Sequence, residues 1–148
     1  MTLLLEVTGG SRFKRRMIED VCNFAYPILL PKRRKPVYIE INLVDVEEGF
    51  EAFCHNQDDD DFMIEMSRKI KGDDLITAIL HELVHVKQGI KKELTEKKGI
   101  QYWKGVSQDG VEYFDQPWEI EAYAMQEELL NKYNKTVPKI KRILRNFL

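Results

Sequence analysis

The sequence predicts an α+β fold in which a small twisted sheet packs against two helices that carry polar side chains toward the interior. The chain has 148 residues, 43% of them hydrophobic, which is enough for the core of one domain and too little for two ordinary ones. Residues 37–44 alternate apolar and polar side chains, as in a strand with one buried face. Residues 75–84 carry apolar side chains on more than one face of a helix, as in a buried helix. We therefore expect residues 1–148 to form a single domain.

The N-terminal part is predicted to form a strand and a helix. Residues 2–7 are a short apolar run that ends at two glycines, which is typical of a strand followed by a turn. Ser11 is a candidate N-cap for a helix that reaches Tyr26, where Pro27 should stop it. Apolar side chains recur in this segment every three or four residues, so one face of the helix should pack on the core.

Three further strands are predicted, at residues 37–44, 50–55 and 62–67. The acidic residues 56–61 connect the last two. A calcium site there is one interpretation, but the run lacks the ligand spacing and the closing glutamate of a calcium loop, so a solvated hairpin turn is favoured. We expect residues 62–67 to be an edge strand that could pair with an extended peptide. His55, at the end of the preceding strand, is expected to be a surface or packing residue, and the alternative is that it lines the active-site cleft.

The central helix is predicted over residues 73–89. Asp73 follows a glycine and is a candidate N-cap, and Asp74 suits the positive start of a helix. Gly89 supplies a C-terminal stop.

The central helix contains an HExxH motif at residues 81–85. Residues four apart lie one turn above each other on a helix, so His81 and His85 can bind one metal ion together. Glu82 is rotated away from that line, where its carboxylate can act as a base rather than as a ligand. Without a metal, this helix would bury two imidazoles and a carboxylate among aliphatic side chains, which costs free energy. Metal binding is therefore favoured.

A third ligand is expected elsewhere, because a catalytic zinc site has three protein ligands and a water. Residues 115–130 are its predicted source, since Asp115 can cap a helix and Pro117 is tolerated in the first turn. Glu119 shares a helical face with small and apolar side chains, whereas Glu121 lies on another face. The spacing favours Glu119 and leaves Glu121 as the alternative. Whichever is not the ligand should be a solvated acid near the helix start.

The HExxH motif, followed by Glu119 and Ala122, resembles the gluzincin metallopeptidases, in which a second helix brings a glutamate to the two histidines. The small size is similar to that of minigluzincins and of the short metallopeptidase domains of phages and prophages. The resemblance covers residues 62–130. Tyr123 departs from the pattern, because several gluzincin groups have at this position an aspartate or asparagine that supports a histidine.

The resemblance implies a minimal zincin-like fold, with the active-site helix below the sheet and a substrate that runs antiparallel to the edge strand. It implies Zn²⁺ as the cofactor, held by His81, His85 and Glu119, although nickel, cobalt or iron could occupy such a site. Glu82 would be the general base in hydrolysis of extended peptide segments.

Three functions are compatible with these residues. The first is a zinc peptidase, the second is a regulatory protease that acts on a repressor or a DNA-associated protein, and the third is a non-catalytic, metal-stabilised domain that binds proteins. Retention of Glu82 argues against the third, because a structural site needs no base. A donor to the oxyanion is also expected in a peptidase. The candidates for it are Tyr102, Tyr113 and Tyr123.

Composition limits the expected partners and compartment. A formal net charge of -2 gives no general attraction to nucleic acids or anionic membranes, and no apolar run approaches the ~20 residues of a membrane span. Cys22 and Cys54 lack zinc-finger or redox spacing, and no signal peptide opens the chain. We expect a cytoplasmic protein with free thiols that binds a peptide or protein substrate, without nucleic acid or membrane.

The C-terminal residues 137–148 are basic and amphipathic. We expect them to form a helix whose apolar face packs on the core. The alternative is that this tail covers the active-site cleft and keeps the enzyme inactive.

Overall fold

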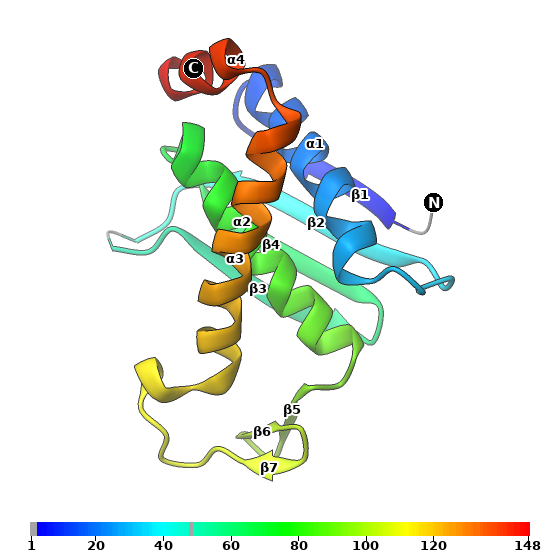
Figure 1. Ribbon diagram of the computed structural model, residues 1–148. Helices are drawn as coiled ribbons and strands as arrows, with labels where there is room; N and C mark the ends of the chain where they lie inside the picture. Colours follow the sequence, from blue (N-terminus) through cyan, green and yellow to red (C-terminus); the bar gives the residue numbers. More distant parts are fainter. Residues whose placement is uncertain (1–2, 48) are drawn as a thin grey trace.

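The computed structural model describes residues 3–47 and 49–148, which form an α+β fold (Figure 1). The larger sheet of this part of the chain has the strand order β1-β2-β4-β3. The strands are β1 (Leu3–Thr8), β2 (Val37–Val44), β3 (Ala52–Asp58) and β4 (Asp61–Ser67). β1, β2 and β4 are parallel, and β3 runs antiparallel to β4. Thr2, the first residue of the predicted N-terminal strand, lies outside the described residues.

The core lies between the larger sheet and the helices. The predicted alternation in β2 is confirmed, because every second side chain from Val37 to Leu43 is at most 2% exposed. Helices α1 (Arg12–Leu29) and α2 (Gly72–Ile90) cover one face of this sheet (Figure 1). Helix α3 (Pro117–Thr136) packs on α2, which therefore lies between the sheet and α3. This arrangement leaves one side of α2 free to face α3 and the edge of the sheet.

The predicted cap of α1 is correct, but its predicted end is wrong. The Ser11 hydroxyl accepts a hydrogen bond from the Lys14 backbone N–H at 3.2 Å, as an N-cap does. Pro27 does not stop the helix, which continues to Leu29. Pro27 removes one backbone hydrogen bond near the end of α1, but the helix continues for two more residues, and Leu29 is buried in the core.

The edge strand is β3, and the prediction that residues 62–67 form the edge is wrong. β4 lies between β2 and β3, and its side chains Phe62, Ile64 and Met66 are at most 1% exposed. β3 is more polar and more exposed, as is typical of an edge. A tight turn at residues 59–60 joins the two strands, so the acidic connection is the predicted hairpin turn.

Both ends of α2 differ from their prediction. The N-cap is Lys71, not Asp73, and the Lys71 side chain forms no capping hydrogen bond. Instead, the backbone N–H of Asp73 donates to Oδ1 of Asn146 at 2.9 Å, so a residue from the far end of the chain supplies the cap. Gly89 does not end the helix, which runs on to Ile90.

The role of Gly89 is close packing. A Cβ atom at this position would lie 2.9 Å from Cε1 and 3.0 Å from Cζ of Phe62, whose ring is buried. We predict that Gly89→Ala destabilises the fold by about 1–3 kcal/mol, because the ring has no room to move. Urea unfolding of the two proteins measures this difference. A gain of up to ~1 kcal/mol, the usual effect of Gly→Ala inside a helix, would contradict the prediction.

A second, small sheet follows α2 and was not predicted. It consists of β5 (Leu94–Lys97), β6 (Ile100–Trp103) and β7 (Val106–Ser107) in antiparallel order. Two-residue turns connect its strands, and each turn is a Lys-Gly pair with positive φ at both residues. Such turns match the twist of a hairpin, but lysine at a positive φ is an unusual choice and gives a weak signal in a sequence.

The segment before α3 was predicted only in part. Pro117 is the first residue of α3, as expected, but Gln116 is the N-cap. Asp115, the predicted cap, belongs to the short 3-10 helix η1 (Tyr113–Asp115). Pro117 lacks an N–H and has a fixed φ, so it suits this first helical position.

The C-terminal tail contradicts the expectation that its apolar face packs on the core. It forms α4 (Lys139–Leu144) and the 3-10 helix η2 (Arg145–Phe147) near the start of α2 (Figure 1). Its buried side chain is Arg145, which donates to Asp73 Oδ1 at 2.8 Å and to Asn134 Oδ1 at 2.7 Å. The predicted apolar face is exposed, at Ile140, Ile143, Leu144 and Phe147. Polar contacts to two helices, rather than apolar burial, hold the tail in place.

Among the described residues, none of the helices combines the length and the hydropathy that a membrane span requires.

Candidate metal centre

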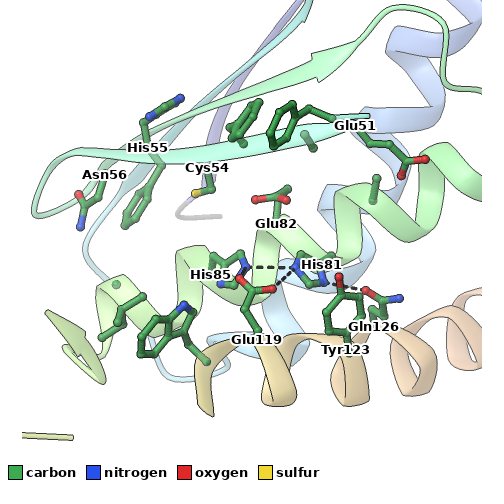
Figure 2. Close-up of a pocket in the computed structure, with 18 of the residues that line it drawn as sticks. Glu51, Cys54, His55, Asn56, His81, Glu82, His85, Glu119, Tyr123 and Gln126 are labelled. Carbon is green, nitrogen blue, oxygen red and sulfur yellow. Dashed lines mark hydrogen bonds and ion pairs between the residues drawn. The ribbon is translucent and has the colours of Figure 1, made fainter. Parts of the chain in front are cut away.

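Two histidines of α2 point in one direction, toward α3 (Figure 2). His81 and His85 lie one helical turn apart, and their Nε2 atoms are 3.2 Å from each other. Their ring centroids are 4.8 Å apart and the rings are nearly perpendicular. Both side chains are mostly buried, at 12% and 14% exposure. The predicted pair is therefore in place to share one ligand.

Glu119 of α3 completes this group. Its Oε2 lies 3.1 Å from Nε2 of His81 and its Oε1 lies 3.0 Å from Nε2 of His85. The potential ligand atoms of the three residues all lie within 4.8 Å of one another. Among the described residues this is the one group of three or more His, Cys, Asp or Glu side chains that could hold a metal ion. Glu119, and not Glu121, therefore lies with the two histidines.

Glu121 lies on another face of α3 and is not the solvated acid that we expected. Its Oε1 accepts from Nζ of Lys87 at 2.6 Å and from Nε2 of Gln88 at 3.2 Å. Lys87 is only 8% exposed and also pairs with Glu93 at 2.9 Å. The pair from Lys87 to Glu121 lowers the pKa of the Glu121 carboxyl, although burial opposes this. The second glutamate thus joins α3 to α2 beside the metal centre.

Gln88 fixes the tautomer of His85. Its amide nitrogen donates to the carbonyl oxygen of Trp118 at 2.9 Å and to Glu121, both of which can only accept in this network. The amide oxygen of Gln88 must then face Nδ1 of His85, which is 2.8 Å away. Nδ1 therefore carries a proton, and Nε2, which lies 3.0 Å from Oε1 of Glu119, is the ring nitrogen left to bind a metal ion. This is the arrangement of a metal-binding imidazole with an oriented outer hydrogen bond.

The ring of His81 has an equivalent support in Gln126. The Oε1 atom of Gln126 lies 2.7 Å from Nδ1 of His81. Tyr123, which stands where a supporting Asp or Asn was expected, instead places its ring 4.7 Å from the His81 ring centroid. Our sequence analysis missed Gln88 and Gln126 as supporting residues. The signal was present for Gln126, which lies two helical turns after Glu119 on the same face.

These contacts fit a divalent cation. If each Nδ1 carries the single proton of its ring, the Nε2 lone pairs of His81 and His85 and the carboxylate of Glu119 face one another, and all three are electron donors. Such a cluster is electrostatically unfavourable unless a proton or a metal ion lies among them. Two imidazoles and one carboxylate are a ligand set of catalytic zinc sites.

No family model, curated protein or solved structure matches the chain. What the site can do follows from its own geometry.

Loss of the support to His81 should weaken metal binding. We predict that Gln126→Leu lowers the affinity for Zn²⁺ about 10- to 100-fold, because the imidazole loses the acceptor that fixes its tautomer. Competition with a chromogenic zinc chelator measures the affinity. Gln57→Leu, on exposed β3, is the matched control and should bind as tightly as the wild type. Equal affinity of Gln126→Leu and the control would show that the contact does not orient His81.

Glu82 lies beside the metal centre and not within it. Its side chain is 7% exposed and points across the cleft toward β3, near Cys54 (Figure 2). No hydrogen bond or ion pair joins the Glu82 carboxylate to the described residues. Burial raises the pKa of this carboxyl, and the two histidines oppose the shift. A buried carboxylate without a protein partner, facing an open cleft, is available to a water or a substrate.

The cleft around these residues has a volume of about 1120 Å³ and lies between β3, α2, α3 and the small sheet. Tyr113 and Tyr123 line it, whereas Tyr102 does not. The Tyr113 hydroxyl donates to Oε2 of Glu119 at 3.1 Å. Burial raises the pKa of Tyr113, so it remains a neutral donor. Of the three tyrosines suggested as oxyanion donors, Tyr113 and Tyr123 therefore remain as candidates that line the cleft.

The cleft also bears on the expectations for His55 and for the C-terminal tail. His55 is exposed, as predicted for a surface residue, but it lines the cleft, with Nε2 3.6 Å from Oε1 of Glu65. The C-terminal tail does not cover the cleft, because none of the described residues that line it lies beyond Gln126. The inhibitory-tail hypothesis is therefore wrong for this structure.

Proposed function

We propose that the protein is a zinc-dependent peptidase that hydrolyses extended protein segments. The proposal rests on one arrangement of side chains. The potential ligand atoms of His81, His85 and Glu119 lie close together, and Glu82, which has no hydrogen-bond partner among the described residues, lies beside them in an open cleft. A structural metal site would need the three ligands but not the unpartnered Glu82. For this reason the hydrolytic function is favoured over a metal-stabilised binding domain.

Each residue of the candidate centre would have its own role in hydrolysis. A divalent ion held by His81, His85 and Glu119 would supply Lewis-acid chemistry toward a water and a substrate carbonyl. The Glu82 carboxylate would accept a proton from that water and later return it to the leaving amine. The raised pKa of Glu82 makes it a stronger base than an ordinary glutamate. Tyr113 or Tyr123 would donate to the oxygen that becomes negative.

The position of β3 favours an extended substrate. β3 is the edge of the larger sheet and borders the cleft, so one side of its backbone is open to pairing. A peptide added to this edge would pass over His81 and His85 (Figure 2). An edge strand above a helix that carries HExxH also supports the proposed gluzincin-type, zincin-like assignment. The free thiols Cys22 and Cys54 are consistent with a cytoplasmic location.

Metal removal tests the proposed activity. The purified full chain should hydrolyse unfolded casein, lose this activity after treatment with a chelator, and regain it with one equivalent of Zn²⁺. Circular dichroism before and after treatment checks that the fold persists. Hydrolysis that continues in the metal-free protein would contradict the proposal.

A further inference from the structure

One end of the cleft carries acidic side chains that have no partner. Glu51 precedes β3 and Asp74 lies in the first turn of α2, and both are exposed and line the cleft. Among the described residues, neither side chain takes part in a hydrogen bond or ion pair. Figure 2 shows Glu51 at the opposite end of the cleft from His55 and Asn56. The cleft therefore has a distinct acidic end, on the side of His81.

The other end does not balance this charge. Lys92 lines that end, but its Nζ is held by Asp59 at 2.6 Å. His55 lies against Glu65, and Glu96 adds a further exposed carboxylate to the lining. Among the described residues, the cleft is thus lined by carboxylates without an ion-pair partner, whereas Lys92 already forms an ion pair with Asp59. An approaching peptide would meet a negative potential.

The acidic end lies about two helical turns of α2 from His81. Glu82, which is 7% exposed and has no hydrogen-bond partner among the described residues, lines the same cleft and points toward β3. Asp74 precedes His81 by seven residues of α2, which is about 10 Å along the helix axis. An extended peptide advances about 3.3 Å per residue, so this distance spans about three residues. The N-terminus of α2 carries a partial positive charge, and one of its N–H groups, that of Asp73, donates a hydrogen bond to Oδ1 of Asn146.

We propose that the cleft selects peptides with a lysine or arginine about three residues from the bond that is cut, on the side of Glu51 and Asp74. This inference rests on the proposed peptidase function. A long cationic side chain at that place can reach between the two carboxylates while its stem follows the wall of the cleft. Exposed ion pairs are weakened by solvent, so the preference is a matter of rate and not of all-or-none cleavage.

Cleavage mapping tests this selection. The zinc-loaded full chain digests unfolded casein, and mass spectrometry identifies the bonds that are cut. Two synthetic peptides are then made around a mapped bond, with Lys or Gln at the third position. We expect kcat/KM to be about two- to tenfold higher for the Lys peptide at low salt. The ratio should fall toward one at 1 M salt, where the screening length is about 3 Å.

Variants test whether Glu51 and Asp74 cause the preference for the Lys peptide. The double change Glu51→Gln and Asp74→Asn should bring the ratio of kcat/KM for the Lys peptide to that for the Gln peptide to about one. Glu127→Gln, an exposed acid on α3 outside the cleft, is the control and should keep the wild-type ratio. Equal rates for both peptides in the wild type, or a ratio that survives in the double variant, would overturn the inference.

The failure of the peptidase function would look different. If casein is not cut at all, the proposed peptidase activity is wrong. The preference for cationic peptides is then tested by measuring peptide binding. Fluorescein-labelled (Ala-Lys)5 should then bind the full chain more tightly than (Ala-Gln)5, and the double variant should remove the difference. Equal binding of the two peptides would overturn the inference independently of hydrolysis.

Discussion

Replacing Glu82 by glutamine is expected to remove hydrolysis while zinc stays bound. The amide has the shape of the carboxylate but cannot accept a proton from a water at neutral pH, so kcat should fall about 10²- to 10⁴-fold. Glu82 lies beside the group of potential ligands and not in it. Within residues 3–47 and 49–148, its side chain makes no hydrogen bond that the change would break. Casein hydrolysis and zinc content are measured on the same preparation.

Stability provides the control for Glu82→Gln. A buried carboxylate without a partner costs free energy, so the glutamine variant should resist urea at least as well as the wild type. Glu127→Gln should keep full activity. Undiminished hydrolysis in Glu82→Gln would remove the proposed general base, and loss of zinc would show that Glu82 has a structural role instead.

The second large effect is expected at Glu119. Glu119→Gln should lower the affinity for zinc more than about 100-fold. Loss of a residue that only supports a ligand typically lowers the affinity by up to about 100-fold, whereas this change removes a charged ligand itself. Burial opposes ionisation of the Glu119 carboxyl, but the two histidine rings beside it hold its pKa well below the usual range. The carboxylate is therefore ionised and ready to bind a cation. Competition with a zinc chelator gives the affinity.

Glu121→Gln is the matched control for this experiment, since both glutamates lie in the first turns of α3. It should bind zinc nearly as well as the wild type, because Glu121 reaches the centre only through Gln88. It should instead reduce stability by about 1–3 kcal/mol, since Lys87 is buried and would keep only Glu93 as an ionic partner. The reverse result, with zinc lost in Glu121→Gln and kept in Glu119→Gln, would exchange the two roles.

The sequence predicted the elements whose signals are local. The alternation in β2 and the cap at Ser11 depend on neighbours within a few residues, and both are confirmed. The HExxH spacing depends only on helix geometry, so the direction of His81 and His85 could be predicted. Glu119 was harder, because its role required that a second helix dock on the first. Its inward face was nevertheless visible in the apolar residues around it.

Features that depend on distant partners were missed. The edge position belongs to β3 because β4 inserts beside β2, and nothing within β4 fixes its neighbours. The cap of α2 comes from Asn146, which is 73 residues away in the chain. Gln88 gains its role only because Trp118 and Glu121 orient its amide. Such residues are found by tracing hydrogen bonds in three dimensions, not by reading spacing.

X-ray absorption at the zinc edge of the purified full chain tests the metal centre most directly. We predict one zinc ion per chain, surrounded by two imidazole nitrogens at about 2.0–2.1 Å and by oxygen atoms from Glu119 and solvent at about 2.0–2.2 Å. A chain that retains no zinc would contradict this account. So would a zinc–sulfur distance of about 2.3 Å, because it would place a cysteine in the position that a water must occupy.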